Sequence, residues 1–138
     1  MTRHSLYQVA AIASRAGFTR KALTEAVAIA MHTTQGDDAF DNLYCIDPLI
    51  HFRGLFGQSV DKYASTEPHK LFNPDFCATE LYKDYRANQY AWDDGNAKVI
   101  ALIGGNIKQV GQAIRSRTPT QPIAPPSKLA LVAYTHRL

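Results

Sequence analysis

The sequence predicts a mainly α domain with a small β region, followed by an extended arm. Apolar residues recur with helical spacing in several segments, whereas the stretch between residues 36 and 59 loses that spacing. Four prolines then gather within eight residues, from Pro119 to Pro126. A chain of 138 residues buries about two thirds of its unfolded surface, enough for one core without disulfides or metal. We therefore divide the chain into one domain over residues 1–116 and an arm over residues 117–138.

The first element expected is an amphipathic helix over residues 5–16. Its apolar residues share one face, Ser5 is a suitable amino-terminal cap, and Gly17 provides the stop. We expect this helix to pack against the helix that follows.

The second helix, between Thr19 and Gly36, is the predicted centre of the domain. Apolar side chains recur at helical intervals, and small alanines cover much of the remaining surface, so neighbouring helices can approach closely. Thr19 is expected to cap its first turn, and Gly36 to turn the chain with a positive φ just after its end.

Residues 36–52 mix acidic, aromatic and aliphatic residues with Pro48, which predicts a loop leading to one or two short strands. The next segment, RGLFGQS at residues 53–59, is expected to be a strand of the same small β region. Gly57 inside it predicts a bulge or a shifted register.

A strong helix start follows at Asn73-Pro74-Asp75, because Asn caps, Pro suits the first helical position, and an early Asp complements the positive helix end. This helix should run to about Tyr90. A turn over residues 92–96 and two short helices, over residues 97–103 and 106–115, complete the domain, with Gly104-Gly105 as the break between them.

The proline-rich segment after residue 117 must be extended, and the last eleven residues are too apolar for a solvated tail. Such an arm is a docking device, either a strand added to a partner's sheet or a strap on its own domain. The expected docking side chains are Leu129, Leu131, Val132 and Tyr134.

Composition narrows the expected partners. The chain has 15 Lys and Arg against 12 Asp and Glu, a net charge of +3 that no basic run concentrates. We expect no nucleic-acid partner, although a weakly basic surface suits anionic cell-wall polymers. Cys45 and Cys77 lack C-x-x-C spacing and are expected to be free, buried thiols. No cofactor, metal site or membrane span is expected, because no ligand spacing and no window of ~20 apolar residues is present.

Two segments together resemble a known family. AVAIAMHTTQG, which ends the central helix, and RGLFGQS resemble the pattern A-x-A-x-A-E-S-G-G followed by R-G-L-W-Q-I-N. This is the pattern of the lysozyme-like, or soluble lytic transglycosylase-like, domains of bacteriophage tail proteins and bacterial wall enzymes. LFNPDFCATELYKDY is similar to the next helix of that family, so the resemblance covers about residues 5 to 115. It implies a lysozyme-like α+β fold with a sugar cleft between its helices and its β region.

In that family a Glu at the helix end protonates the glycosidic oxygen of peptidoglycan. An ungapped alignment places this position on Thr33, whose hydroxyl has a pKa far too high for that role. An acid recruited from the next loop would be Asp37, Asp38 or Asp41, although clustered loop aspartates are normally ionised. The resemblance implies a cleft lined by His32, Gly54, Leu55, Phe56, Gln58, Tyr90 and Trp92, with Phe52 and Tyr63 as further aromatic candidates.

Three functions remain open from the sequence. The first expectation is a structural component of a phage tail or baseplate that has lost glycosidase activity, assembled in the host cytoplasm and carried in the virion. The second is an active tail lysozyme or lytic transglycosylase with a recruited Asp as its acid. The third is a peptidoglycan binder that does not cleave. Fold resemblance cannot separate them, because function depends on the site.

Overall fold

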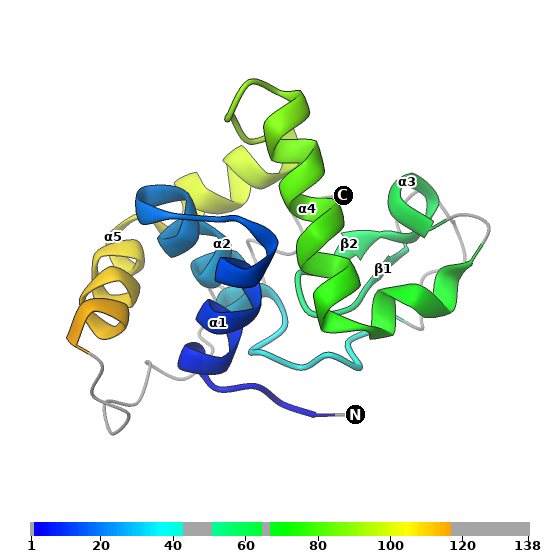
Figure 1. The fold of residues 1–138 in the computed structure, drawn as a ribbon, viewed down its shortest axis with the longest axis horizontal. Coiled ribbons are helices and arrows are strands. Elements are labelled where there is room, and N and C mark those ends of the chain that lie inside the picture. Colours follow the sequence, from blue (N-terminus) through cyan, green and yellow to red (C-terminus); the bar gives the residue numbers. More distant parts are fainter. Residues whose placement is uncertain (1, 43–50, 65–66, 117–138) are drawn as a thin grey trace.

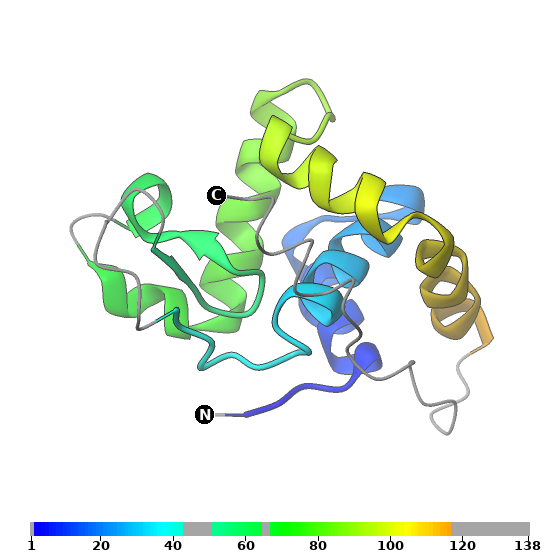
Figure 2. The same cartoon turned by 180° about the vertical axis from the view of Figure 1, so that it is seen from behind.

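The computed structural model describes residues 2–42, 51–64 and 67–116. This part of the chain holds five α-helices, one 3-10 helix and a two-stranded antiparallel sheet, so the predicted α+β class with mostly helical content is confirmed. The elements are α1 (Leu6–Ala16), α2 (Arg20–Thr33), β1 (Phe52–Arg53), β2 (Gln58–Ser59), α3 (Val60–Ala64), η2 (Pro68–Phe72), α4 (Pro74–Ala87) and α5 (Asp94–Ser116). Figures 1 and 2 show α5 at one end of the molecule, the hairpin and α3 at the other, and α4 between them.

Helix α1 begins and ends as predicted. The Ser5 hydroxyl accepts from the Gln8 backbone N–H, and the Gln8 side chain accepts from the Ser5 N–H, which together form a capping box. Gly17, with φ of 125°, ends the helix. The buried face carries Leu6, Val9, Ile12 and Ala13.

Helix α2 is the buried centre of the fold. The five residues from Ala26 to Ala30 have no exposed surface, and the helix packs against both α1 and α5. Thr19 occupies the amino-terminal cap position, and its carbonyl accepts from the Leu23 N–H, but the predicted bond from its side chain is wrong, since that side chain makes no capping bond. Arg20 starts the helix with a φ of 52°.

The chain turns after α2 through Gly36, whose φ of 80° confirms the predicted positive value, although the helix itself already ends at Thr33. A Cβ at Gly36 would lie 2.2 Å from the His4 carbonyl oxygen, so the position requires glycine. This closeness exists because the amino-terminal segment pairs with the loop: His4 donates its N–H to the Gly36 carbonyl, and Asp38 donates to the Thr2 carbonyl.

The segment 53–59, expected to be one strand, instead contains a hairpin turn, with Arg53 at the end of β1 before it and Gln58–Ser59 as β2 after it. Strands β1 and β2 pair antiparallel, with Phe52 opposite Ser59 and Arg53 opposite Gln58. Gly54 and Gly57 both have positive φ, at 86° and 59°, and Gly57 donates its N–H to the Gly54 carbonyl. The extra glycine therefore closes a tight turn and produces no bulge. The segment that ends at Asn42, before the hairpin in the chain, also pairs with it, through an isolated antiparallel bridge between Asp41 and Arg53.

Helix α4 begins at the predicted place, where the Asn73 side chain accepts from the Phe76 N–H, but it ends at Ala87 instead of near Tyr90. Helix α5 starts earlier than expected, at Asp94, and its two halves meet at Gly104, which has non-helical φ and ψ of 7° and −85°. The predicted break is thus a kink between two continuous halves. Cys77 is a free, fully buried thiol, whereas Cys45 and the arm lie outside the described residues.

Candidate functional site

The carboxyl end of α2 is buried and touches the hairpin turn. The Thr34 hydroxyl lies 2.6 Å from the Leu55 carbonyl oxygen and ties the helix to that turn. Thr33, at the position that the family resemblance assigns to the acid, is buried, and its Oγ1 has no hydrogen-bond partner among the described residues. The same holds for Nε2 of His32, and burial lowers the pKa of this imidazole, so it is neutral at pH 7.

Each of the three candidate acids has a basic partner. Asp37 lies 4.0 Å from the Arg3 guanidinium, and its carboxylate accepts from the Ala39 N–H. Asp38 lies 2.9 Å from His4 Nε2 and accepts from the Thr2 N–H. Burial raises the pKa of Asp38, but these two hydrogen bonds and the nearby positive charge outweigh it and leave the pKa below its usual value.

Asp41 is the most enclosed of the three. Its side chain is 8% exposed and lies between two basic groups: Arg53, with a nitrogen-oxygen distance of 2.8 Å, and the His51 ring. This carboxylate holds the hairpin to the preceding loop, because Arg53 belongs to β1.

The cleft residues that were expected in the hairpin are not exposed to solvent. Leu55 and Phe56 have no exposed surface and belong to the core, and Gly54 lies against the Leu71 backbone. Gln58 is also buried; its amide nitrogen donates to the Cys77 carbonyl, while its Oε1 has no partner among the described residues. Gln58 borders a pocket next to the hairpin.

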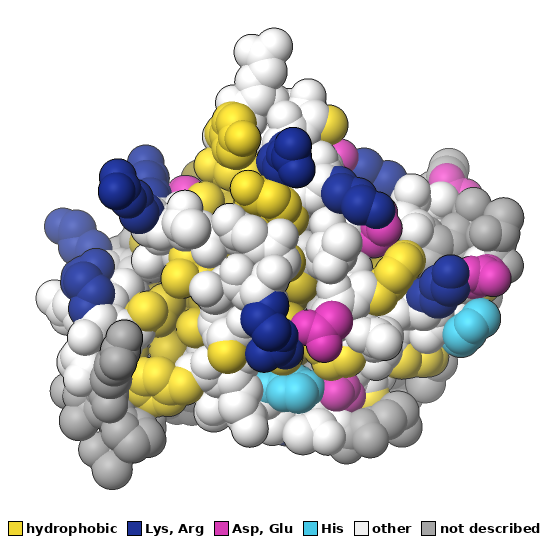
Figure 3. All heavy atoms as spheres, in the orientation of Figure 1, with side chains coloured by type: hydrophobic (Ala, Val, Ile, Leu, Met, Phe, Trp, Pro, Cys, Tyr) yellow, Lys and Arg dark blue, Asp and Glu magenta, His cyan; other side chains and the backbone are white. Residues whose placement is uncertain are grey.

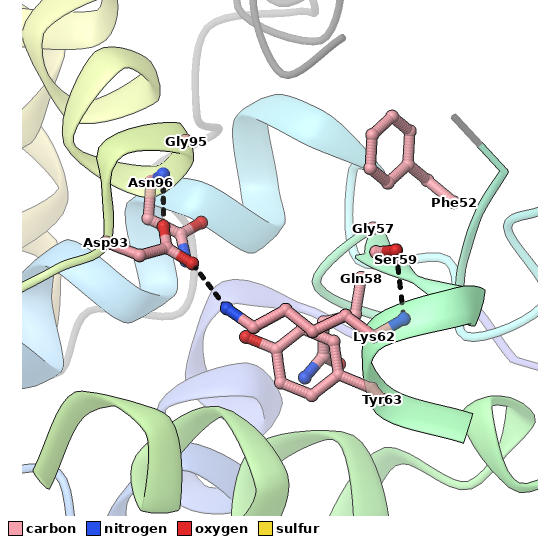
Figure 4. A pocket seen from close by; sticks show the side chains of 9 residues that line it. All are labelled: Phe52, Gly57, Gln58, Ser59, Lys62, Tyr63, Asp93, Gly95 and Asn96. Atoms are coloured by element: carbon pink, nitrogen blue, oxygen red, sulfur yellow. Dashed lines mark hydrogen bonds and ion pairs between the residues drawn. The ribbon is translucent and has the colours of Figure 1, made fainter. Parts of the chain in front are cut away.

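That pocket, of about 190 Å³, lies between the hairpin, α3 and the start of α5. It is lined by Phe52, Gly57, Gln58, Ser59, Lys62, Tyr63, Asp93, Gly95 and Asn96. Figure 4 shows the Lys62 side chain reaching across it to the Asp93 carboxylate, at 2.9 Å, over the Tyr63 ring. Asp93 also accepts from the Asn96 N–H and so holds the first turn of α5.

Lys62 joins three elements. Besides Asp93 before α5, it contacts Asp84 of α4 at 3.1 Å, and the Tyr63 hydroxyl donates to the same Asp84 carboxylate. Burial alone would lower the pKa of Lys62, but the bonds to the two carboxylates raise it well above the ordinary value, so the ammonium is charged. Asp84 and Asp93 are therefore both ion-paired.

The two remaining predicted cleft residues lie elsewhere. Tyr90 is 63% exposed beyond the end of α4, where its ring meets the edge of Tyr85. Trp92 stacks on Phe18 and donates its indole N–H to Glu25. Neither lines the pocket.

Sequence reasoning missed Ser59, Lys62 and Asn96. One local signal was available: Asp93 stands three residues before Asn96 at the start of a helical pattern, in the manner of an amino-terminal cap. Nothing local marks Lys62, whose partners lie 22 and 31 residues away.

Two further findings concern only the part of the chain that the structure describes. It contains no group of three or more His, Cys, Asp or Glu side chains arranged to hold a metal ion. None of its helices combines the length and the apolar character needed to cross a membrane. The expected docking residues Leu129, Leu131, Val132 and Tyr134 lie outside the described residues.

Comparisons of the chain with protein-family models, with curated proteins and with solved structures found no match.

Proposed function

We propose that this chain is a lysozyme-like domain without glycosidase activity that serves as a structural component of a phage tail or baseplate. The observation that carries the loss of activity is the pairing of all three candidate acids with basic groups. The proposed family and the setting in a tail rest on the sequence resemblance, and the α+β architecture agrees with them without being specific to them.

The chemical argument concerns protonation. A general acid needs a carboxyl that is still protonated near pH 7, which requires an apolar pocket and no cationic neighbour. Asp37, Asp38 and Asp41 have the opposite surroundings, with Arg3, His4 and Arg53 beside them. Thr33 offers only a hydroxyl. The pKa of Asp38 is lowered, which is the opposite of what a general acid needs, and Asp37 and Asp41 each have a cationic neighbour.

The direct test is clearing of purified peptidoglycan, followed by turbidity and by zymogram. We expect no more clearing than in a buffer control, because loss of a general acid typically lowers the rate by a factor of ~10²–10⁴. Thr33→Glu should restore measurable clearing if the rest of a cleft is present, and Thr33→Gln, which has the same shape without an acid, should not. Robust clearing by the natural chain that disappears in Asp38→Asn or Asp41→Asn would overturn the proposal in favour of an active enzyme.

The assembly part of the proposal has its own test. The arm over residues 117–138 is proposed to dock on neighbouring virion proteins, so its removal should abolish incorporation into the particle and leave the melting temperature of the domain nearly unchanged. A melting temperature lowered by many degrees would show that the arm straps its own domain instead.

One observation favours a second candidate, a peptidoglycan binder that does not cleave. The pocket combines two aromatic rings, Phe52 and Tyr63, with amide groups, and the buried Gln58 Oε1 is an acceptor without a partner among the described residues. Aromatic faces and amides suit a sugar with hydroxyl and acetamido groups. Co-sedimentation with insoluble peptidoglycan that Ser59→Trp abolishes, by filling the pocket, would support this candidate; no co-sedimentation would remove it.

A further inference from the structure

A second, larger hollow lies far from the hairpin, between the first turn of α2 and the last turns of α5. It has a volume of about 580 Å³. Its apolar wall is formed by Leu23, Ile107 and Ile114, all partly exposed although they pack on the core. We call it the α2–α5 groove.

The border of the groove is strongly basic. Four exposed cations line it, Arg20, Lys21, Lys108 and Arg115, and no acidic residue of the described part of the chain does. None of the four forms an ion pair within the described chain, whereas Arg3, Arg15, Arg53, Lys62, Lys70 and Lys83 do. Figure 3 shows Lys and Arg side chains gathered at the α5 end of the molecule, beside hydrophobic side chains. The positive charge here is therefore not neutralised locally.

An apolar wall with a cationic border selects an occupant that is both apolar and acidic. We propose that the α2–α5 groove binds an acidic amphipathic helix of a partner protein, which inserts aliphatic side chains between the two helices and presents Glu or Asp to the four cations. This inference does not depend on the presence or absence of glycosidase activity.

The surroundings argue against other polyanions. A nucleic acid would leave the apolar wall uncovered and would find no aromatic ring for base stacking among the groove residues. A membrane surface is broad, whereas this site is a concave groove between two helices.

Charge also argues against the chain's own segments. Residues 117–138 contain Arg117, Lys128 and Arg137 and no Asp or Glu, so the arm carries the same sign as the groove. A second copy would bring the same four cations if its groove faced this one. A separate acidic partner is the occupant that complements the site.

The test uses a fluorescent, designed helical peptide with Leu on one face and Glu on the other, titrated with the full chain at low salt. We expect binding that weakens at least tenfold in Lys21→Glu/Lys108→Glu, because reversing two border charges replaces attraction by repulsion. The control is Lys98→Glu, which reverses an exposed lysine of α5 outside the groove. It should leave affinity unchanged and is compared with each single border reversal, Lys21→Glu and Lys108→Glu, which changes the net charge by the same amount. A peptide with its Leu replaced by Gln, or with its Glu replaced by Gln, should bind at least tenfold more weakly.

Other outcomes would overturn the proposal. Equal binding of the Leu-free acidic peptide, or equal loss in Lys98→Glu, would mean that net charge alone is responsible. Preferential binding of phosphatidylglycerol vesicles or of a DNA duplex would identify another class of partner. Binding of a synthetic 117–138 peptide, or dimerisation of the chain that the charge reversals abolish, would assign the groove to the protein's own segments.

Discussion

The helical end of the molecule and its hairpin end are held together by different kinds of contact. At the helical end, α1, α2, α4 and α5 bury continuous apolar faces, and an aromatic group of Phe18, Tyr82, Tyr85 and Trp92 fills the space beside α4. At the hairpin end the sheet has two residues in each strand. There, Leu55 and Phe56 are buried in the core, and single polar contacts join the hairpin to its neighbours, such as Asp41 with Arg53, Thr34 with Leu55, and Lys62 with two aspartates.

The two ends should therefore tolerate different substitutions. Apolar burial is spread over many atoms, so a helix face can lose one side chain at a cost proportional to the space left behind. A hairpin held by close backbone approach and by ion pairs depends on a few positions, each with a distinct chemical requirement.

The largest effect is expected from Phe18→Ala at the helical end. Phe18 is fully buried and its ring lies 5.0 Å from that of Tyr82 and 5.6 Å from that of Trp92. Removing it should cost about 3–5 kcal/mol of unfolding free energy, measured by urea denaturation. A loss of only ~1 kcal/mol would show that the helical end is loosely packed around Phe18.

The next effect concerns the hairpin turn, where Gly54→Ala introduces a Cβ 2.1 Å from the Leu71 carbonyl oxygen at a φ of 86°. We expect a cost of about 2 kcal/mol or more, from backbone strain and from displacement of η2. The control is Gly105→Ala, because a Cβ there meets nothing within 4 Å and should leave stability unchanged or slightly higher. Equal melting temperatures for the two variants would contradict a hairpin held by close backbone approach.

A smaller, pH-dependent effect belongs to Asp38. Its folded pKa is lowered, so its stabilisation is present above the unfolded value of about 3.9 and is lost as the pH falls through the folded value. Asp38→Asn should cost about 1 kcal/mol at pH 6 and progressively less toward pH 3, as followed by thermal melting. Asp75→Asn, which breaks an exposed pair with Arg15, should change little at any pH. A cost independent of pH would mean that Asp38 acts through shape and not through charge.

The smallest effect is expected from Lys62→Met. Its side chain is nearly half exposed, so the two ion pairs should contribute at most ~1 kcal/mol, and 1 M salt should remove most of that. A raised lysine pKa gives stabilisation that is lost only as the pH rises through the folded value, so the difference should stay constant between pH 5 and 9. A large, salt-insensitive cost would place Lys62 among the main supports of the hairpin end.

The same contrast explains what the sequence could predict. Ser5 and Asn73 were identifiable because each caps a backbone group three residues away, and helical spacing marked the buried faces of α1, α2 and α4. The hairpin turn was not identifiable from the sequence. Gly54 is required there because it lies against the Leu71 carbonyl, and no residue within RGLFGQS indicates a contact with a residue so far along the chain.

The candidate site shows the same limit. Gln58 was predicted as a cleft residue and does border the pocket, but Leu55 and Phe56 lie in the core and Trp92 belongs to the aromatic group beside α4. Leu55, Phe56 and Gln58 are all buried. The order of residues in this short segment therefore does not show which side chain borders a pocket and which lies in the core. The partners of Lys62 lie 22 and 31 residues along the chain, and no local pattern identifies contacts at that distance.

The buried thiol of Cys77 makes the boundary between the two ends observable. Burial raises its pKa to about 12, and the thiol donates to the Leu71 carbonyl beside the hairpin turn. Because only the thiolate reacts with alkylating reagents, labelling in a Cys45→Ser background requires this junction to separate. The rate of labelling at rising denaturant concentrations then reports whether the hairpin detaches by itself or only when the helices unfold. A single native side chain can thereby distinguish one cooperative unit from two.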